Sequence, residues 1–341
     1  MDKEWYLGEL REALLGAGKD GDYVSACISY AERLLDEGLP VIFDAKHLSS
    51  LLGINPYAFG ELLYSVDCYG YHEMEIPKKS GGMRMLSVPA VDLKYIQRWI
   101  LDNILSNIHI SEYANGFAEG KSIVTNAISH IGAECIINLD IQDFFPSISY
   151  EQVFRIFRYY GYTKQLSYVL AKLCTYKGVL PQGSPASPYI TNILCLKLDK
   201  RLSRVAKRYS AVYTRYADDI TFSGGRGIKS LLPVAERIIG EEGFAVNARK
   251  THTAYRHQRQ EVTGLVINDG NLKVPKKYKR KLRQEIYYCK RYGVYEHQEK
   301  TGETHAFYRE HLYGKAYFVH MVEPELGKRL LAELDDIEWE Y

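Results

Sequence analysis

The stretch TRYADDITFSGG, residues 214–225, places two aspartates side by side between two short runs of β-branched and aromatic residues. Such runs on either side of a short polar stretch predict a β-hairpin, with Asp218 and Asp219 at its tip. Neither residue belongs to the Asn-Gly or Asp-Gly pairs that usually form a tight turn. The pair therefore indicates a need for negative charge at the tip rather than a need for a turn.

A third carboxylate, Asp140, ends the apolar run CIINLD (135–140), which predicts a short buried strand. A carboxylate at the end of one strand can meet others at the tip of a neighbouring hairpin. Mg²⁺ prefers carboxylate oxygens and substrate phosphates as ligands, and two such ions can activate a hydroxyl and stabilise a leaving pyrophosphate. The alternative is structural, with Asp140 as a helix N-cap and the aspartate pair as a surface turn.

The rest of the chain predicts helices with a few antiparallel strands. Leucines at helical spacing indicate helices within residues 4–66. Residues 71–90 alternate and turn at a Gly-Gly pair, which predicts a second hairpin with a basic loop. A short strand region is expected between about 242 and 261, before EVTGLVIN (261–268), and further helices are expected at about 91–108, 150–175, 187–208 and 229–242 and from about 275 onward.

The formal net charge of +2 conceals an uneven distribution of charge along the 341 residues. Residues 1–40 carry four Lys/Arg and nine Asp/Glu, whereas residues 271–300 carry ten Lys/Arg and three Glu. Several of the 29 tyrosines lie beside these cations. This combination suits single-stranded nucleic acid, because bases stack on the rings and phosphates pair with the cations. A solvated helix face and amphipathic core tyrosines would explain the same composition.

The six cysteines form no CxxC pair and no regular spacing, so they indicate neither a zinc site nor a disulfide framework. The acidic, amphipathic N-terminus does not resemble a signal peptide. No apolar run approaches the length of about 18 residues that a membrane span needs. We therefore expect a cytoplasmic protein without a membrane partner.

The order of the motifs is more specific than any one of them. A basic hairpin is followed by the strand that ends in Asp140, then by LPQG (180–183), YADD (216–219), NARKT (247–251) and VTGLVI (262–267). In this order they resemble the fingers, palm and thumb of reverse transcriptases over about residues 70–330. The stretches NAISH (126–130) and VTG (262–264) also resemble the Asn-Ala-x-x-His and Val-Thr-Gly elements of retron reverse transcriptases.

This resemblance implies an α+β fold, a right-hand polymerase with fingers, an antiparallel palm sheet and a helical thumb. Residues 1–66 would form an N-terminal helical extension. Residues 67–260 would form the fingers and the palm that carries the catalytic aspartates, and residues 261–341 the primer-grip region and thumb.

The resemblance also assigns the catalytic roles. Asp140 and Asp218 would be the main ligands of two Mg²⁺ ions, and Asp219 would be the third catalytic carboxylate. Because neighbouring side chains of an extended strand diverge, Asp219 is expected to be the less direct ligand. The backbone carbonyl of Ile141 would be a further metal ligand.

Five residues are expected to bind the incoming deoxynucleoside triphosphate. Phe145 matches the aromatic gate that excludes a 2′-hydroxyl, with plain core packing as the alternative, and Gln182 would contact the nucleotide. Lys250 matches the lysine that protonates departing pyrophosphate, although a surface lysine would look the same. Lys78 and Arg84 would hold the triphosphate, Arg by a bidentate contact and Lys as a point charge. The spacing does not distinguish Lys78 from its neighbour Lys79.

The contacts with RNA and primer are expected on two elements and on the thumb. Asn126 and His130 lie one helical turn apart and would be RNA-facing or scaffold residues, and a lone histidine is not expected to hold a metal. Val262, Thr263 and Gly264 would lie near the primer terminus. The basic block of the thumb would bind RNA through Lys276, Lys277, Lys279, Arg280 and Lys281.

A retron enzyme copies a cognate structured noncoding RNA (msr–msd) from an internal guanosine 2′-hydroxyl and gives branched RNA–DNA (msDNA). Such enzymes commonly act with a toxic effector in bacterial anti-phage defence. Two alternatives remain at this point. Another bacterial reverse transcriptase, of the group II intron or phage-defence type, should lack the Asn-Ala-x-x-His and Val-Thr-Gly elements together. A non-catalytic RNA-binding scaffold would not need Asp140, Asp218, Phe145 and Gln182 all intact.

Overall fold

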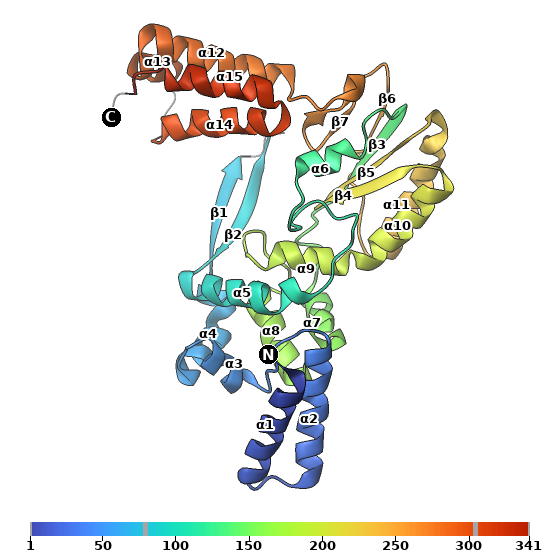
Figure 1. The fold of residues 1–341 in the computed structure, drawn as a ribbon, viewed down its shortest axis with the longest axis vertical. Coiled ribbons are helices and arrows are strands. Elements are labelled where there is room, and N and C mark those ends of the chain that lie inside the picture. Colours follow the sequence, from blue (N-terminus) through green and yellow to red (C-terminus); the bar gives the residue numbers. More distant parts are fainter. Residues whose placement is uncertain (1, 78–80, 303–305, 340–341) are drawn as a thin grey trace. The chain divides into compact units, whose positions relative to one another are not determined.

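The computed structural model describes residues 2–77, 81–302 and 306–339 (Figure 1). The chain forms two compact units, and each is built from several separate segments. The first comprises residues 1–117, 141–200 and 239–245, and the second comprises residues 118–140, 201–238 and 246–341. The chain therefore passes repeatedly from one unit to the other, and the linear three-part division at residues 66 and 260 stays a prediction.

The first unit is mainly helical, and its helices begin at capping residues that the sequence supplies. The Asp20 carboxylate accepts a hydrogen bond from the Tyr23 amide at the start of α2, and Ser149 forms a capping box with Gln152 at the start of α7. Its helices are α1 (Lys3–Gly16), α2 (Gly21–Asp36), α3 (Ala45–Leu51), α4 (Pro56–Tyr69), α5 (Val91–Asn103), η1 (Leu105–Asn107), α7 (Tyr150–Tyr159), α8 (Lys164–Cys174) and α9 (Ser187–Leu194). Two more, α10 (Leu196–Arg208) and α11 (Leu232–Glu241), pass from one unit to the other.

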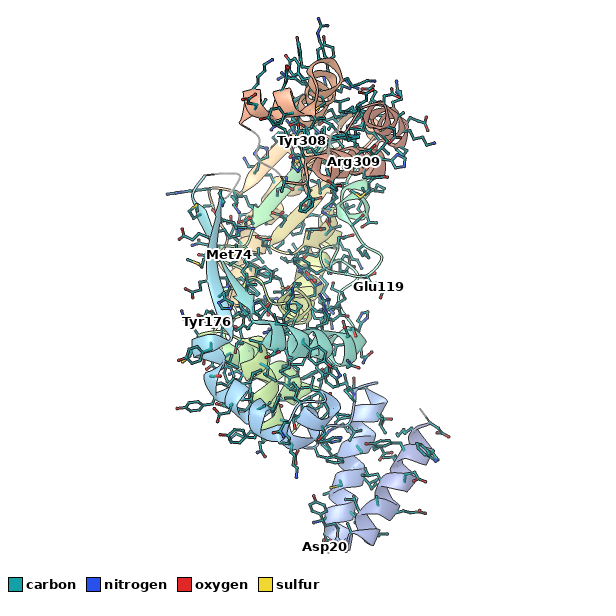
Figure 2. All side chains as sticks on the ribbon, turned by 90° about the vertical axis from the view of Figure 1, so that its left-hand side faces the viewer. Asp20, Met74, Glu119, Tyr176, Tyr308 and Arg309 are labelled. Carbon is teal, nitrogen blue, oxygen red and sulfur yellow. The ribbon has the colours of Figure 1, made fainter. Side chains whose placement is uncertain are left out.

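The first unit also contains the hairpin that the alternating pattern of residues 71–90 predicts. Strand β1 (Tyr71–Pro77) pairs antiparallel with β2 (Met83–Pro89), in a register that sets Tyr71 opposite Pro89. Met74, labelled on β1 in Figure 2, is half exposed, as are Met83 and Met85 on β2. The hairpin is thus a two-stranded ribbon with exposed side chains along it.

The second unit is built on a four-stranded antiparallel sheet with the strand order β4-β5-β3-β6. Its buried side chains include β-branched and aromatic residues such as Ile136, Ile137 and Phe222, each with none of its surface exposed. The strands are β3 (Cys135–Asp140), β4 (Val212–Tyr216), β5 (Asp219–Gly224) and β6 (His252–Tyr255), with η2 (Arg226–Leu231) following β5.

A short hairpin and a helical bundle complete the second unit. Helix α6 (Ile123–Ile128) and the hairpin of β7 (Glu261–Val262) and β8 (Leu265–Val266) share a small apolar cluster that includes Ala127, Ile136 and Leu265. After η3 (Asn268–Gly270), helices α12 (Lys276–Tyr292), α13 (Val294–Thr301), α14 (Tyr308–Val322) and α15 (Pro324–Asp335) enclose a second cluster.

This mixture of helices and antiparallel sheets confirms the predicted α+β class. None of the described helices has the length and apolar character that crossing a membrane requires.

Candidate active site

The turn between β4 and β5 fixes the position of the aspartate pair. Tyr216 and Asp219 are paired across the two strands, which leaves Ala217 and Asp218 as a two-residue loop. Ala217 has a φ of 56°, a left-handed conformation that favours glycine. Strained backbone of this kind costs on the order of 1–3 kcal/mol and is concentrated at functional sites.

Asp140 lies directly opposite Asp219 in the sheet, at the point where β3 ends and β5 begins. Paired residues of antiparallel strands have their Cβ atoms about 5 Å apart, and like charges in such a pair repel. Although Asp219 as a residue is exposed, protein around its carboxyl displaces water. This burial, with the charges of Asp218 and Asp140, raises the pKa of Asp219 to about 6, and Lys250 opposes the shift. The three carboxylates therefore form a cluster of negative charge that a cation would relieve.

Lys250 supplies part of that compensation. Its Nζ lies 2.7 Å from Oδ2 of Asp140, a carboxylate that is almost wholly buried. The Nδ2 of Asn247 donates to Oδ1 of Asp140 at 3.3 Å, and the Asn247 amide donates to the Asp140 carbonyl at 2.8 Å. The Asp140 carboxylate also raises the pKa of Lys250, so this ammonium keeps its proton.

The donor set of the cluster suits a hard divalent cation, because it consists of carboxylate oxygens. In the part of the chain that the structure describes, however, no three His, Cys, Asp or Glu side chains already converge in a metal-holding arrangement. The Lys250 ammonium lies against Asp140, a buried carboxylate. A divalent cation would compete with Lys250 for Asp140.

The Asn-Ala-x-x-His element contacts both strands of the aspartate hairpin through its histidine. The His130 ring is buried, with Nδ1 2.6 Å from the Ser223 hydroxyl and Nε2 2.7 Å from the Thr214 hydroxyl. Burial lowers the pKa of His130 to about 4, so near neutral pH the ring is uncharged, with one nitrogen donating and the other accepting. His130 thus connects the chain just after α6 to both strands of the hairpin with the aspartates at its turn, and this position favours the scaffold interpretation over an RNA-facing one.

Asn126 lies one turn before His130 and connects the same element to the Val-Thr-Gly turn. Its Nδ2 lies 3.5 Å from the Thr263 hydroxyl, which itself donates to the Ile123 carbonyl at 3.4 Å. Thr263 and Gly264 have φ values of 46° and 82° between β7 and β8, and positive φ at both central residues defines a type I′ turn. Asn126 and Val262 are buried. The contact between the two elements, 137 residues apart, was not predicted from the sequence.

The LPQG loop lies against the hairpin of the first unit. The Ser87 amide of β2 donates to the Gln182 carbonyl at 2.9 Å. Gly183 has a φ of 138°, and a Cβ at this position would meet the Ser87 carbonyl oxygen at 2.5 Å, so only glycine allows this approach. Arg84 is exposed on the same strand, and Lys78 lies outside the described residues.

Phe145 is half-buried, and Ile141, which follows Asp140 directly, is buried. The Phe145 ring lies 5.7 Å from that of Phe144 and 6.4 Å from that of Phe117. Phe144 is buried and also packs on Phe244 at 5.6 Å. Of the two neighbouring phenylalanines, Phe144 is therefore the core residue and Phe145 keeps an accessible surface.

The thumb cations fall into two groups. Lys279 is held by Glu323, with its Nζ 2.7 Å and 2.9 Å from the two carboxylate oxygens. This ion pair is largely buried, so Glu323 holds the Lys279 ammonium in this structure, and its expected RNA contact stays a prediction. Lys281 lies 3.7 Å from Glu285 but is mostly exposed. The other expected contacts, Lys276, Lys277 and Arg280, are exposed along α12.

Comparison with known proteins identifies relatives over most of the chain. The profile of the reverse transcriptase (RNA-dependent DNA polymerase) family matches residues 76–282. The Retron Mx162 reverse transcriptase of Myxococcus xanthus is 35% identical over 90% of this chain and 70% of its own length. The Retron Ec86 reverse transcriptase of Escherichia coli is 34% identical over 91% of this chain and 94% of its own.

Among solved structures, a telomerase from Candida albicans, in complex with a fragment of telomeric RNA, matches with a TM-score of 0.46 and 12% identity. The match covers 82% of this chain and 60% of that one. A structural similarity this weak carries no argument, so the relationship to known proteins rests on the sequence matches.

Proposed function

Because this chain belongs to the retron reverse transcriptases, which are RNA-directed DNA polymerases, we propose that it extends a hydroxyl primer with Asp140, Asp218 and Asp219 as ligands of two Mg²⁺ ions. Reverse transcriptases as a family depend on a divalent metal. The observation that supports the proposal most strongly is the pairing of Asp140 with Asp219 across the sheet, with Asp218 in the adjoining turn. Primer extension by the purified chain on an RNA template, with each carboxylate changed in turn, tests it.

Bound Mg²⁺ would activate the attacking hydroxyl and stabilise the leaving pyrophosphate. The carboxylates and the Ile141 carbonyl would hold the ions, and Lys250 would give a proton to the departing pyrophosphate. The support for Lys250 is its place on Asp140 and its raised pKa, which keeps it protonated until a leaving group accepts the proton. With a cation held by Asp140, the Lys250 ammonium would be available to the phosphates.

The first unit carries the residues that we propose for nucleotide binding. Gln182 contacts the nucleotide, and its support is a loop braced against β2 by the Ser87 hydrogen bond. Arg84 lies on that strand with its side chain exposed and binds the triphosphate together with Lys78. Phe145 packs against the sugar and excludes a 2′-hydroxyl, which its half-exposed ring allows.

Phe145→Val is expected to raise the incorporation of ribonucleotides relative to deoxyribonucleotides by roughly tenfold or more. The smaller side chain leaves room for a 2′-hydroxyl, and pocket contacts of this size discriminate by about 1–3 kcal/mol. The measurement is the ratio of the two kcat/KM values for matched nucleotides on one primer–template.

Phe144→Val is the matched control for this prediction, because it removes the same ring from the buried neighbour. The control is expected to lower thermal stability without changing the ratio. If Phe145→Val leaves the ratio unchanged in folded protein, Phe145 is an ordinary core residue.

The proposed substrate is a cognate structured noncoding RNA (msr–msd), which the enzyme copies from an internal 2′-hydroxyl to give branched RNA–DNA. The relationship to retron reverse transcriptases and the contact between the Asn-Ala-x-x-His and Val-Thr-Gly elements support this. An effector protein as partner, a role in anti-phage defence and a cytoplasmic location complete the proposal. The acidic charge of residues 1–40 makes the N-terminal helices a candidate contact for the effector.

The triple variant Lys276→Gln, Lys277→Gln, Arg280→Gln is expected to weaken RNA binding and to flatten its salt dependence. Log affinity falls linearly with log salt, and each lost phosphate contact makes this negative slope shallower by about 0.7 for single-stranded RNA. The measurement is a fluorescence titration of labelled RNA at several salt concentrations. Unchanged affinity and slope would mean that these three cations only form a solvent-exposed face of the helix and do not contact RNA.

Lys279→Gln gives the contrasting control. This change breaks the buried pair with Glu323, whose carboxylate also accepts from the Val274 amide at 2.8 Å. It is expected to lower the melting temperature of the thumb and to leave the salt slope near that of the wild type.

A further inference from the structure

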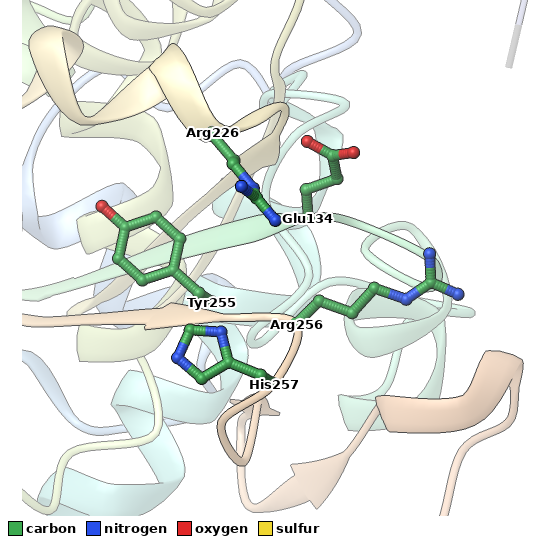
Figure 3. A pocket seen from close by; sticks show the side chains of 5 residues that line it. All are labelled: Glu134, Arg226, Tyr255, Arg256 and His257. Atoms are coloured by element: carbon green, nitrogen blue, oxygen red, sulfur yellow. The ribbon is translucent and has the colours of Figure 1, made fainter.

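A second polar site lies at the end of the palm sheet that is opposite to the carboxylates. There Cys135 of β3 is paired with Gly224 of β5 and with Tyr255 of β6. A pocket of about 680 Å³ opens at this end (Figure 3). At about 3.3 Å per residue, the five steps along β3 from Cys135 to Asp140 separate the two ends by roughly 17 Å. The pocket is lined by Glu134, Arg226, Tyr255, Arg256 and His257.

The turn after β6 is braced by hydrogen bonds on both sides. The Arg256 amide donates to the Glu134 carbonyl at 2.9 Å, and the Gln258 amide donates to the Tyr255 carbonyl at 2.8 Å. From the other side, Nδ2 of Asn268 donates to the Gln258 carbonyl at 2.9 Å. Arg256 and His257 therefore stand on a preorganised support, which reduces the entropy lost when a ligand binds.

Two arginines give the pocket positive charge. Arg226 comes from η2 and Arg256 from the turn, and both are exposed (Figure 3). Within the described residues, neither guanidinium has an ion-pair partner, whereas the nearby Arg259 lies 2.6 Å from Glu261. A guanidinium fork without a carboxylate partner suits a bidentate phosphate contact.

The other lining residues favour a nucleotide over a simple anion. The rings of Tyr255 and His257 are parallel to within 2°, with centroids 6.1 Å apart, and present flat surfaces on which a base can stack. Glu134 would repel a free phosphate, but its carboxylate can accept a hydrogen bond from a ribose 2′-hydroxyl or from an amino group of a base. Phosphate, base and ribose are thus each matched by a residue of the pocket.

We propose that this pocket binds a single-stranded segment of the RNA partner, with Arg226 and Arg256 on phosphates, Tyr255 and His257 against a base and Glu134 on a ribose or base donor. This inference rests on the proposed function, because it takes RNA as the substrate. It adds a docking point roughly 17 Å from the chemistry, where the RNA is held without taking part in the reaction.

The test compares single variants of neighbouring arginines in the full chain, with a short fluorescein-labelled oligouridine RNA as the probe. Arg226→Gln and Arg256→Gln are each expected to weaken binding about fivefold and to make the negative slope of log affinity against log salt shallower by about 0.7. Arg259→Gln removes the same charge from a residue that Glu261 already holds, and it is expected to stay within about twofold of the wild type. All three should extend a pre-annealed primer–template at the wild-type rate.

Several results would overturn the inference. An equal loss of binding in Arg259→Gln would show a general effect of charge, and slower extension in Arg226→Gln or Arg256→Gln would place these residues in the catalytic function. Competition by inorganic phosphate at the concentration of the RNA would show a simple anion site. An oligothymidine DNA with the same sensitivity to Arg256→Gln would make the occupant DNA. Failure of the wild type to extend any primer would refute the proposed function separately, since that readout does not depend on the pocket.

Discussion

Asp218→Asn is expected to reduce primer extension by roughly 10³-fold or more, on the order of 4 kcal/mol in the barrier, while RNA affinity stays within about a few-fold. Asparagine keeps the shape of the side chain but removes the charge that a divalent metal requires. RNA affinity depends mainly on cations elsewhere in the chain, so it is expected to survive. The measurement is single-turnover extension of an annealed primer in Mg²⁺, with RNA binding measured in parallel.

The melting temperature of the Asp218→Asn variant shows whether the change has damaged the fold. Asp218 contributes to the repulsion that raises the pKa of Asp219, so its neutralisation is expected to leave the melting temperature equal or higher. Loss of extension together with a lower melting temperature would indicate damage to the fold instead. Asp102→Asn makes the same chemical change at an exposed position on α5 and is expected to be silent. Near-wild-type synthesis by Asp218→Asn would refute the assignment of the metal ligands.

Much of the fold follows from local pattern, because strands and hairpins are encoded by neighbouring residues. The runs on either side of Asp218 and Asp219 predict β4 and β5, and the structure has them with the aspartates at the turn. The position of Asp140 at the end of an apolar run predicts the end of β3. The antiparallel pairing then brings the carboxylates together, as the charge pattern indicates.

The parts that the sequence did not predict depend on contacts between distant residues. Nothing local to Asn126 indicates Thr263, and nothing local to His130 indicates Ser223 and Thr214, because a single sequence holds no information on which distant polar groups share an interior. Lys279 belongs to a basic run, and only the position of Glu323, between α14 and α15, distinguishes it. The sequence therefore does not predict which polar side chains are buried or which partners they have, and only the structure shows this.

Copurification of a DNA covalently joined to RNA is the result expected when the chain is expressed with its cognate noncoding RNA. A carboxylate site of this kind accepts any hydroxyl held in line with the incoming phosphate, and a folded RNA can hold an internal 2′-hydroxyl at near-attack distance. Intramolecular placement of this kind is equivalent to a very high local concentration, on the order of 10⁵ M or more. It replaces a separate primer and makes the enzyme selective for its own RNA.

The branch can be tested on the isolated product and on the RNA that supplies it. Ribonuclease is expected to trim the product to DNA with a small branched RNA remnant, and a 2′,5′-debranching enzyme should then change its mobility. An RNA with a single 2′-deoxyguanosine at the branching position is the matched control. It keeps the fold and removes only the attacking hydroxyl, so it should give no DNA, while extension of a separate annealed primer continues at the wild-type rate. DNA that is linear before debranching, or that is attached to a tyrosine of the protein, would contradict 2′-hydroxyl priming and leave the polymerase activity of the carboxylates intact.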